Sequence, residues 1–389
     1  MLIRGARVAT SSARSADLNL WIHNGIISFS PIPAVENPIL NLEGFLILPG
    51  LINGHDHLEL NLFPKLGCGP YPNASAWAQD IYRPHEPPIR EHLALPKVLR
   101  LRWGAIKNLV AGVTTVAHHN AFHPVFLESS FPVRVVRRYG WAHSIYFSPD
   151  WKSRFENTPP DYPFIIHAAE GTDRAARREV QILANAGALT RSTILVHGVG
   201  VNRLDLPIIE ETGAGIVWCP TSNNFTLRRS LDRAVLNSAV RIVLGSDSAI
   251  TADGDLLDEL HFAHRTVDAH RLYGMVTSES ANLFKLPTGF GTICHEGPAD
   301  LIAMKDDGQT PAMTLMQHYP EMVMISGRVR LISSAMAKVC PTSILNFLQP
   351  LEVEGRGEYL VAEDISSMLK QTTSILQQPP RLAGKAMAA

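Results

Sequence analysis

The chain has 389 residues, of which 46% are hydrophobic and 18% are charged. This composition provides enough apolar matter for a large buried core and too little charge for a disordered chain. Lys and Arg number 35 against 36 Asp and Glu, giving a formal net charge of −1. No positive excess exists to neutralise phosphates or anionic lipids, so we expect a small-molecule substrate and neither nucleic acid nor membrane as partner.

Signal and cysteine patterns favour a cytoplasmic protein. Arg4 and Arg7 interrupt what would have to be an apolar signal core, and no later window approaches 18 uninterrupted apolar residues. The four cysteines are scattered without a C-x-x-C pair, at positions Cys68, Cys219, Cys294 and Cys340. Structural thiols are therefore expected, and neither a disulfide framework nor a cysteine-type zinc site.

The first 45 residues predict short strands, at 1–8, 18–22 and 26–30, with an Asn24-Gly25 turn before the third. From about Phe45, apolar β-rich runs alternate with amphipathic stretches, a pattern typical of parallel strands joined by crossover helices. Eight such strands are predicted, near 45–54, 113–118, 133–136, 143–147, 163–168, 193–197, 214–219 and 241–246.

Helical periodicity is clearest between these strands, at 90–110, 174–186, 203–212 and 255–271. Thr172 or Asp173 is a suitable cap for the second helix, and Gly187 follows it where a terminating glycine is expected. The segment 148–162 carries three prolines and no convincing period, so it predicts a loop in place of a helix.

After about residue 287 the strand pattern returns, at 297–304 and 321–329, and these strands could pair with the N-terminal ones. We therefore predict a (β/α)8 barrel over 46–287 and a composite β-domain from 1–45 and 288–362, which suits the chain length. The tail 363–389 predicts a terminal helix followed by a mobile end.

A His-x-His pair ends the first buried strand, in Leu48-Pro49-Gly50-Leu51-Ile52-Asn53-Gly54-His55-Asp56-His57. Alternate residues of a strand share a face, so His55 and His57 can offer imidazole nitrogens to one metal ion. Taken alone, the pair is explained equally well by polar groups satisfied at a strand end.

Three later strands also end in side chains suited to metal binding or proton transfer, namely His167, His197 and Asp247. The carboxyl ends of barrel strands are where barrel enzymes assemble their sites. Burying four histidines and an aspartate together is costly without an ion or hydrogen bonds. The combined pattern predicts a metal site.

The sequence resembles the metal-dependent amidohydrolase superfamily, in particular the branch of cytosine, guanine and adenosylhomocysteine deaminases and triazine hydrolases. The resemblance rests on an ordered set of motifs: Pro-Gly-Leu-Ile-Asn-Gly-His-Asp-His at 49–57, Gly-Val-Thr-Thr-Val at 112–116, His-Ala-Ala-Glu-Gly at 167–171, Val-His-Gly at 196–198, Cys-Pro-Thr-Ser-Asn at 219–223, Gly-Ser-Asp-Ser at 245–248 and Gly-Pro-Ala-Asp-Leu at 297–301. It implies a distorted (β/α)8 TIM barrel with a small β-sandwich domain formed by both chain ends.

The resemblance also implies roles. One divalent ion, zinc in preference to iron, would be bound by His55, His57, His167 and Asp247. His197 would lie beside the bound water or substrate and could donate to a developing oxyanion, while Glu170 would be the proton shuttle and Asp247 could accept the proton of the water. No lysine ends the fourth strand, where 144–148 reads Ser-Ile-Tyr-Phe-Ser, so one metal is expected and not two.

Substrate-binding candidates carry structural alternatives. His118 and His119 end the second strand, and alternation must turn one of them away from the pocket. Asn223 follows Cys219-Pro220, where an asparagine is equally common as a turn residue. Trp77 lies on a long loop, where an aromatic side chain often serves only for packing. Asp56, between the paired histidines, points outward and predicts a supporting or structural group.

The favoured function is a metal-dependent hydrolase in which an activated water attacks a trigonal carbon of an amino-substituted heterocycle and releases ammonia. The alternatives are a cyclic amide hydrolase acting on C–N bonds, a triazine-type chlorohydrolase, and an inactive scaffold relative. Homodimers are the commonest assembly, but the residues leave the oligomeric state open.

Overall fold

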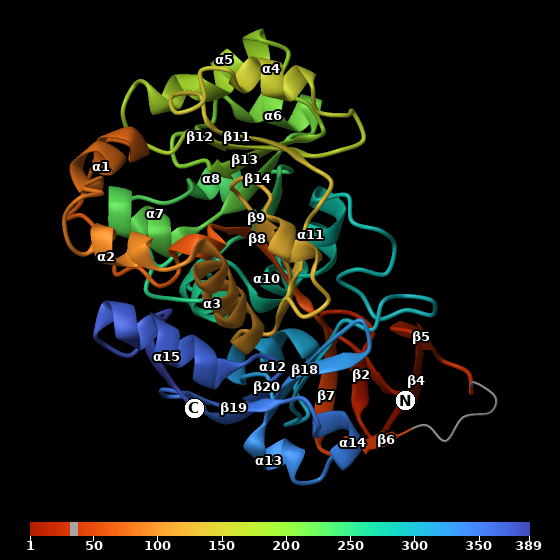
Figure 1. The fold of residues 1–389 in the computed structure, drawn as a ribbon. Helices are drawn as coiled ribbons and strands as arrows, with labels where there is room; N and C mark the ends of the chain where they lie inside the picture. The colour runs from red at the N-terminus through yellow and green to blue at the C-terminus, as the bar shows by residue number, and fades with distance from the viewer. Residues whose placement is uncertain (32–37) are drawn as a thin grey trace.

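The computed structural model describes residues 1–31 and 38–389, and eight parallel strands form its central layer (Figure 1). Three of them form a sheet in the order β10-β9-β8 and five form a sheet in the order β11-β12-β13-β14-β15. Their bounds are β8 Leu51–Asp56, β9 Val113–His118, β10 Arg134–Val135, β11 Gly140–Ser144, β12 Phe164–Ala168, β13 Thr193–His197, β14 Gly215–Trp218 and β15 Arg241–Leu244. Each of the eight predicted runs overlaps one of these strands, although β11 begins at Gly140, before the run 143–147, and β8 extends beyond the run 45–54 to Asp56.

The two sheets do not close into a hydrogen-bonded barrel. Among the described residues, no strand ladder joins β8 to β15 or β10 to β11. The β10 strand has only two residues, and β15 ends at Leu244, before the segment that reaches β8. That gap is bridged by a single backbone hydrogen bond from Asp247 N–H to His55 O, at 3.0 Å. The architecture is a mixed α/β fold with two parallel sheets.

Helices connect the parallel strands along the chain. Their bounds are α1 Ala74–Ile81, α2 Ile89–Ala94, α3 Lys97–Val110, α4 Trp151–Glu156, α5 Glu179–Asn185, α6 Leu206–Thr212, α7 Pro220–Leu227, α8 Arg233–Leu236, α9 Leu256–Ala263, α10 Ala269–Met275 and α11 Ser278–Leu283. The predicted helix 90–110 is interrupted at Pro96, which becomes the N-cap of α3 because proline suits a helix start. The Asp173 carboxylate accepts a hydrogen bond from Ala176 N–H, as a cap does.

The prediction of a loop over 148–162 was wrong in part, because α4 lies within it. Pro149 precedes the helix, and Pro159 and Pro160 follow it, so none of the three prolines lies within it. Arg154 and Asp150, four positions apart, form an ion pair at 2.9 Å that supports this single short helix.

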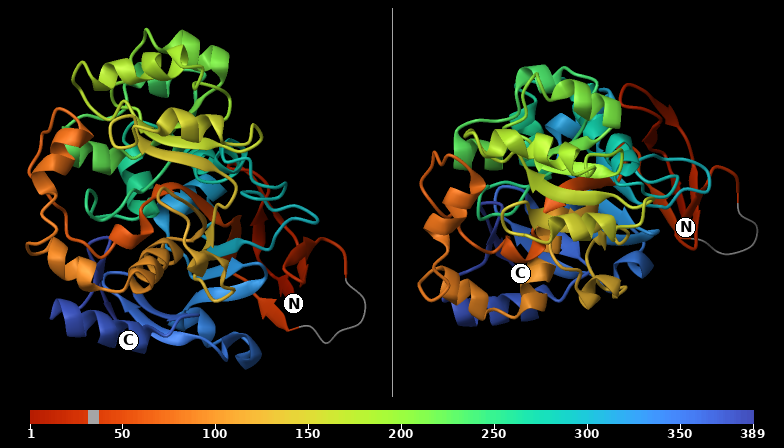
Figure 2. Two further views of the ribbon diagram at one scale, coloured as in Figure 1. Left: turned by 45° about the horizontal axis from the view of Figure 1, so that its top comes forward. Right: turned by 90° about the horizontal axis from the view of Figure 1, so that it is seen from above.

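Strands from both chain ends share one ten-stranded sheet, in the order β21-β22-β19-β20-β18-β17-β16-β7-β2-β3. Its strands are β2 Arg7–Ala9, β3 Ser15–Asp17, β7 Phe45–Pro49, β16 Leu301–Lys305, β17 Met322–Ile325, β18 Arg328–Ser333, β19 Gln349–Val353, β20 Gly357–Val361, β21 Arg381–Leu382 and β22 Lys385–Ala388. The strand β16 of the segment 297–304 pairs with β7, which in turn pairs with the N-terminal β2, while the segment 321–329 reaches them through β16. The strand β7 lies in the run 45–54, predicted as the first barrel strand, but belongs to this sheet and not to the parallel sheets. Figure 2 shows the two ends of the chain on the same side of the molecule.

A second sheet of four strands lies at the N-terminus, in the order β5-β4-β1-β6. Its strands are β1 Leu2–Arg4, β4 Leu20–His23, β5 Ile26–Ser28 and β6 Ile39–Asn41. The predicted Asn24-Gly25 turn joins β4 to β5, with both residues at positive φ, as a two-residue hairpin turn requires. Buried residues of this sheet, such as Ile3 and Leu20, belong to one cluster with Leu301 and Met324 of the ten-stranded sheet.

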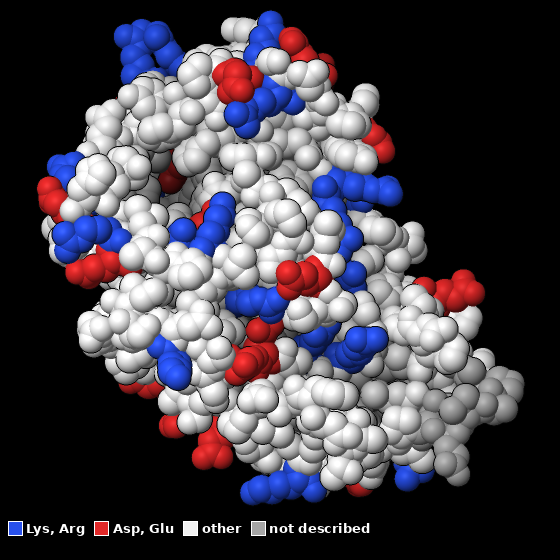
Figure 3. Space-filling view, in the orientation of Figure 1, with Lys and Arg blue, Asp and Glu red and all other residues white. Residues whose placement is uncertain are grey.

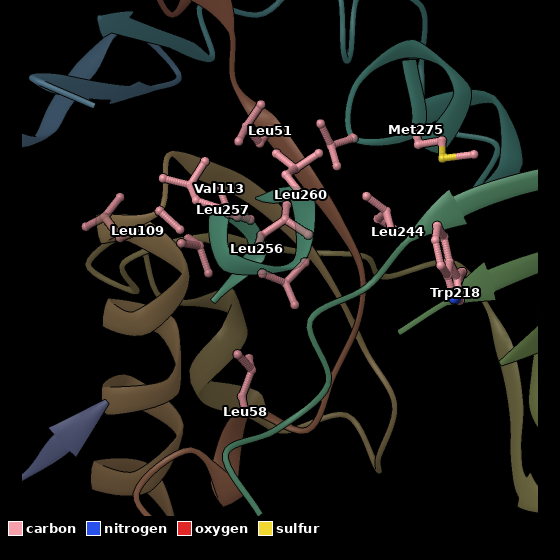
Figure 4. Packing of buried hydrophobic residues seen from close by; sticks show 14 of the residues in the cluster. Leu51, Leu58, Leu109, Val113, Trp218, Leu244, Leu256, Leu257, Leu260 and Met275 are labelled. Carbon is pink, nitrogen blue, oxygen red and sulfur yellow. The ribbon is translucent and has the colours of Figure 1, made fainter. Parts of the chain in front are cut away.

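The main hydrophobic core joins the parallel strands to the helices around them (Figure 4). Leu51 and Val113 from the strands pack with Leu109 of α3 and Leu260 of α9. The C-terminal part of the chain adds four helices, α12 Pro311–Gln317, α13 Ser334–Ala337, α14 Thr342–Leu345 and α15 Ile365–Leu376. Residues of α12 and α15 belong to the main core. Among the described residues, none of the helices combines the length and apolar character that crossing a membrane requires.

The predicted terminal helix is α15, but the residues after it are not a free end. The strand β22 pairs with β19, and the Leu382 and Met387 side chains are buried in the main core. The Trp103 indole N–H of α3 also donates to the Thr372 hydroxyl of α15, at 2.8 Å. The tail is therefore an integral layer of the fold.

Candidate metal centre

The first two predicted ligands extend from the end of β8, which is buried along its whole length. Strand alternation places the His55 and His57 rings on the same side, with ring centroids 4.9 Å apart. Both imidazoles are buried, at 0% and 8% exposure. Neither nitrogen of His55, nor Nδ1 of His57, has a hydrogen-bond partner among the described residues. These orphaned nitrogens are free to bind an ion.

Two further histidines come from the neighbouring strands β12 and β13, and their outer nitrogens are engaged. His167 Nδ1 lies 2.6 Å from the His143 carbonyl oxygen, and His197 Nδ1 lies 2.7 Å from Asn223 Oδ1. Because both partners are acceptors, each Nδ1 carries the proton and each Nε2 presents a lone pair to the centre. His167 Nε2 lies 3.3 Å from His57 Nε2.

Asp247 follows β15 in a left-handed backbone conformation, with φ of +53°. Its carboxylate accepts hydrogen bonds from Ser248 N–H at 2.7 Å, from the Ser222 hydroxyl at 2.7 Å and from the Thr251 hydroxyl at 2.9 Å. Burial opposes ionisation, but the surrounding imidazoles, above all His55 with its Nε2 3.6 Å from Oδ1, hold the pKa of Asp247 well below its usual range. The side chain is therefore an oriented anion.

These side chains fit a divalent ion. One candidate ligand atom from each of His55, His57 and Asp247 lies within 4.8 Å of the others, and the same holds for His55, His167 and His197. Imidazole nitrogens and one carboxylate are the donor set that zinc and similar ions prefer. Three of the four predicted ligands, His55, His57 and Asp247, lie in one group, whereas the fourth, His167, is grouped with His55 and His197.

Glu170 lies on the loop after β12, three residues beyond His167, and its Oε1 is 3.5 Å from His197 Nε2. Burial raises the pKa of Glu170 to about 7; the proximity of His197 opposes this shift. The loop is held by Glu179, which accepts a hydrogen bond from Ala169 N–H at 2.6 Å. A carboxyl group that changes protonation near neutral pH suits proton transfer.

A cavity of about 660 Å³ opens onto this cluster. Its inner end presents polar groups, namely His57, His143, His167, Glu170, His197, Asp247, Ser248 and Thr251. Its outer wall is mostly apolar, formed by Leu60, Phe63, Trp77, Ile81, Ile89, Leu93, Phe147 and Ile250, among others. A concave, largely apolar pocket with convergent polar groups at one end is typical of a small-molecule site.

The four predicted substrate-binding residues are placed differently from one another. Trp77 lines the cavity, although its indole N–H donates to Leu66 O at 2.9 Å. His118 turns toward Glu59, with Nε2 3.6 Å from a carboxylate oxygen, and His119 stacks behind His167 at 4.2 Å. Neither of these two histidines is on the cavity wall, and Asn223 is buried behind His197.

Two features of the site escaped the sequence analysis. His143 lies on β11 and lines the cavity, but it was not among the predicted site residues. Lys107 of α3 is buried at 1% exposure; its Nζ donates to Asp247 O at 2.6 Å and lies 3.3 Å from Asp56 Oδ2. Asp56 thus points outward, as alternation predicts, and is neutralised by a lysine from a distant helix.

Residues 162–330, which carry His167, Glu170, His197 and Asp247, match the amidohydrolase family. This part of the chain is therefore similar to amidohydrolase domains. The chain is also similar to a 5-methylthioadenosine/S-adenosylhomocysteine deaminase of Halobacterium salinarum, at 24% identity over 61% of this chain and 66% of the relative. A deaminase of the same name from Haloarcula marismortui is 25% identical over 72% of this chain and 78% of the relative.

Solved structures show that the fold around this region is shared over almost the whole chain. An adenosine deaminase from Xanthomonas campestris with bound zinc superposes with a TM-score of 0.71, at 16% identity over 97% of both chains. A zinc-complexed atrazine chlorohydrolase from Arthrobacter aurescens superposes with a TM-score of 0.72, at 17% identity over 96% of this chain and 99% of the other.

Proposed function

We propose that this protein is a metal-dependent hydrolase that removes an amino group from a heterocycle, with ammonia as the second product. The observation that carries the proposal is the grouping of three predicted ligands, His55, His57 and Asp247. Two of them, His57 and Asp247, line one cavity together with His167 and Glu170. The names of the two haloarchaeal relatives favour an adenosine-like substrate.

His55, His57, His167 and Asp247 are the residues that would hold the ion, and zinc is favoured because related folds are described with zinc. When bound, such an ion supplies Lewis-acid chemistry, lowering the pKa of water toward 7 and polarising the atom under attack. His197 can serve as a further ligand or lie beside the reacting water.

The chain's own residues account for the proton transfers. In the net reaction, the water oxygen bonds to the ring carbon, the carbon–nitrogen bond breaks, and the amino group leaves as ammonia. Asp247, kept ionised by its three donors, is placed to accept a proton from the attacking water. Glu170, with a pKa of about 7, can donate a proton to the ring nitrogen or to the leaving group.

His197 needs a different role from the one the resemblance implies. Its Nδ1 proton is directed to Asn223 Oδ1, so the neutral ring offers only a lone pair at Nε2. Such a ring can orient water or bind the ion, and it can donate to an oxyanion only after gaining a second proton. Asn223 therefore acts through His197 and not through substrate contact.

Three finer points belong to the proposal. We infer that the two parallel sheets correspond to a distorted (β/α)8 barrel, and that the sheets from the chain ends form the small β-domain over 1–45 and 288–362, to which β7, β21 and β22 add strands from outside these bounds. All four cysteines are unpaired, which supports a reducing compartment such as the cytoplasm.

The test is an ammonia-release screen of the metal-replete protein over purines, pyrimidines, pterins and triazines, with methylthioadenosine and S-adenosylhomocysteine included. For a positive substrate, we expect Glu170→Gln to lower kcat by about 10² to 10⁴. Metal content measured by elemental analysis should stay unchanged, because Glu170 is not among the proposed ligands.

The outcomes separate the alternatives. Ring opening of lactams without ammonia release would replace deamination with cyclic amide hydrolysis, and chloride release from a triazine would indicate a chlorohydrolase. Protein that binds no transition metal, or shows none of these activities, would overturn the proposal in favour of an inactive scaffold.

A further inference from the structure

A second cavity, of about 780 Å³, lies where the segment 126–137 faces the β17–β18 hairpin. It shares no lining residue with the cavity of the metal centre. Four arginines from two distant parts of the chain line it, Arg134 and Arg137 from one side and Arg328 and Arg330 from the other. Figure 3 shows Lys and Arg side chains near the middle of this face, next to several Asp and Glu side chains.

The acidic groups near this cavity are already paired. Glu128, the single carboxylate among the lining residues, forms an ion pair with Arg102 at 2.5 Å. Asp300 pairs with Arg134 at 3.1 Å. For Arg137 and Arg328, both exposed, no side-chain hydrogen bond or ion pair is found within 1–31 and 38–389. The cavity therefore has excess positive charge in a chain whose net charge is −1.

The two inner arginines are held in fixed positions. Arg134 donates to the Ser326 hydroxyl at 2.8 Å, and its guanidinium lies 5.0 Å from the Phe290 ring centre. Arg330 donates to Ser129 O at 2.5 Å. Burial lowers the pKa of Arg330, and the like charge of the nearby Arg328 lowers it further. Among the four guanidinium groups, those of Arg137 and Arg328 have no ion-pair partner in the described residues, and an anion between them and the inner pair would relieve the repulsion of like charges.

We propose that this cavity binds a small organic polyphosphate, with the nucleoside triphosphates as the representative class. Guanidinium groups present several donors in a planar fork that matches phosphate oxygens, so four of them suit more than one phosphate group. The volume exceeds what an inorganic phosphate needs and lies within the range of cavities for nucleotide-sized ligands. The site is independent of the metal centre and of the hydrolase reaction.

The test is isothermal titration of the full-length, metal-loaded protein with UTP, tripolyphosphate and inorganic phosphate, at low and at physiological salt. UTP is chosen because its ring carries no amino group and so cannot be deaminated. We expect saturable binding of UTP that weakens with salt, and a loss of about tenfold or more in the double variant R137Q/R328Q. These two arginines are exposed and have no partners in the fold, so folding should be preserved.

A double variant of two other exposed arginines, R14Q/R203Q, is the matched control and should bind UTP as the wild type does. Capture of metal by the probe would give the same heat in both double variants, so only the difference between them counts. Tripolyphosphate binding as tight as UTP binding would assign the affinity to the phosphates alone. No binding by the wild type, or equal binding by R137Q/R328Q, would overturn the proposal.

Discussion

At the scale of single residues, the metal centre depends on groups that never touch the cavity. Lys107 is enclosed by protein and contacts Asp56, Asn61 and the carbonyl oxygen of Asp247. Asn61 and Asn108 complete the hydrogen bonding of the Asp56 carboxylate. A buried ion pair satisfied in this way positions the backbone of a ligand without contributing an atom to the site.

We predict that Lys107→Met destabilises the metal-free protein by about 3–5 kcal/mol, because Asp56 is left as a buried charge without a counter-charge. Metal affinity, measured by chelator competition, should fall as well, since the Asp247 carbonyl loses its donor. Urea unfolding monitored by circular dichroism gives the stability change. The double variant D56N/K107M should recover most of the lost stability.

Lys97→Met is the control on the same helix. Lys97 pairs with Glu59 at 3.4 Å, but its side chain is 41% exposed, so we expect at most about 1 kcal/mol. Equal losses of stability in Lys107→Met and Lys97→Met would contradict the larger contribution assigned to the buried Lys107–Asp56 pair.

At the scale of elements, α7 and α9 are joined next to the metal centre. Glu259 of α9 is fully buried and accepts hydrogen bonds from the backbone N–H of Thr221, at 3.0 Å, and from its hydroxyl. The next residue, Ser222, donates to Asp247. The position of α9 thus sets where the start of α7 presents its hydroxyl to a proposed ligand.

Glu259 also makes stability depend on pH. Burial raises the pKa of Glu259 from its ordinary 4.5 to about 8. A carboxyl group with a raised pKa in the folded state stabilises the fold fully below pH 4.5 and loses that contribution as pH rises through 8. We predict that Glu259→Gln removes a decline of about 1–3 kcal/mol in the free energy of unfolding between pH 5 and pH 8.5.

Urea unfolding of the wild type and variant at several pH values measures this difference, and other buried carboxyls cancel in the comparison. Glu211→Gln, an exposed residue on α6, should leave the pH dependence unchanged. A wild-type decline that persists in full in Glu259→Gln would contradict the assignment to this residue.

At the scale of the whole molecule, the composite sheet and the parallel strands form one folding unit. The main hydrophobic cluster contains residues of both, such as Val113 of β9 and Leu351 of β19. Arg356, in the turn between β19 and β20, forms an ion pair with Asp255 at 2.6 Å, and both side chains are 1% exposed. Asp255 in turn caps α9 by accepting from Leu257 and Asp258 N–H.

We predict that Arg356→Met lowers the free energy of unfolding by about 3–5 kcal/mol, because the Asp255 charge remains buried without its partner. The loss should appear as one cooperative transition at lower temperature, in both near- and far-ultraviolet circular dichroism. Arg381→Met is the control, since its pair with Glu354 is more than half exposed on both sides, and we expect at most about 1 kcal/mol. Two separate transitions in Arg356→Met would show that the sheet and the strands unfold independently.

Much of the fold followed from local patterns. The eight parallel strands, the N-terminal turn and the pairing of both chain ends were predicted because apolar periodicity and turn residues act over a few positions. The helix α4 and the strands of the tail were missed, because tertiary contacts add to their weak local signals: Trp151 and Phe155 of α4 pack against the main core, and β22 pairs with β19.

By itself, the sequence determined the strand ends that carry His55, His57, His167, His197 and Asp247, because alternation along a strand and the shared edge of parallel strands leave little choice. Only the tertiary structure decided which other side chains support these five residues and which lie away from the cavity. Lys107 beneath Asp247, His143 on the cavity wall and the meeting of Arg134 with Arg328 join residues far apart in the chain. No short-range pattern records such contacts, since they arise from the packing of whole elements against one another.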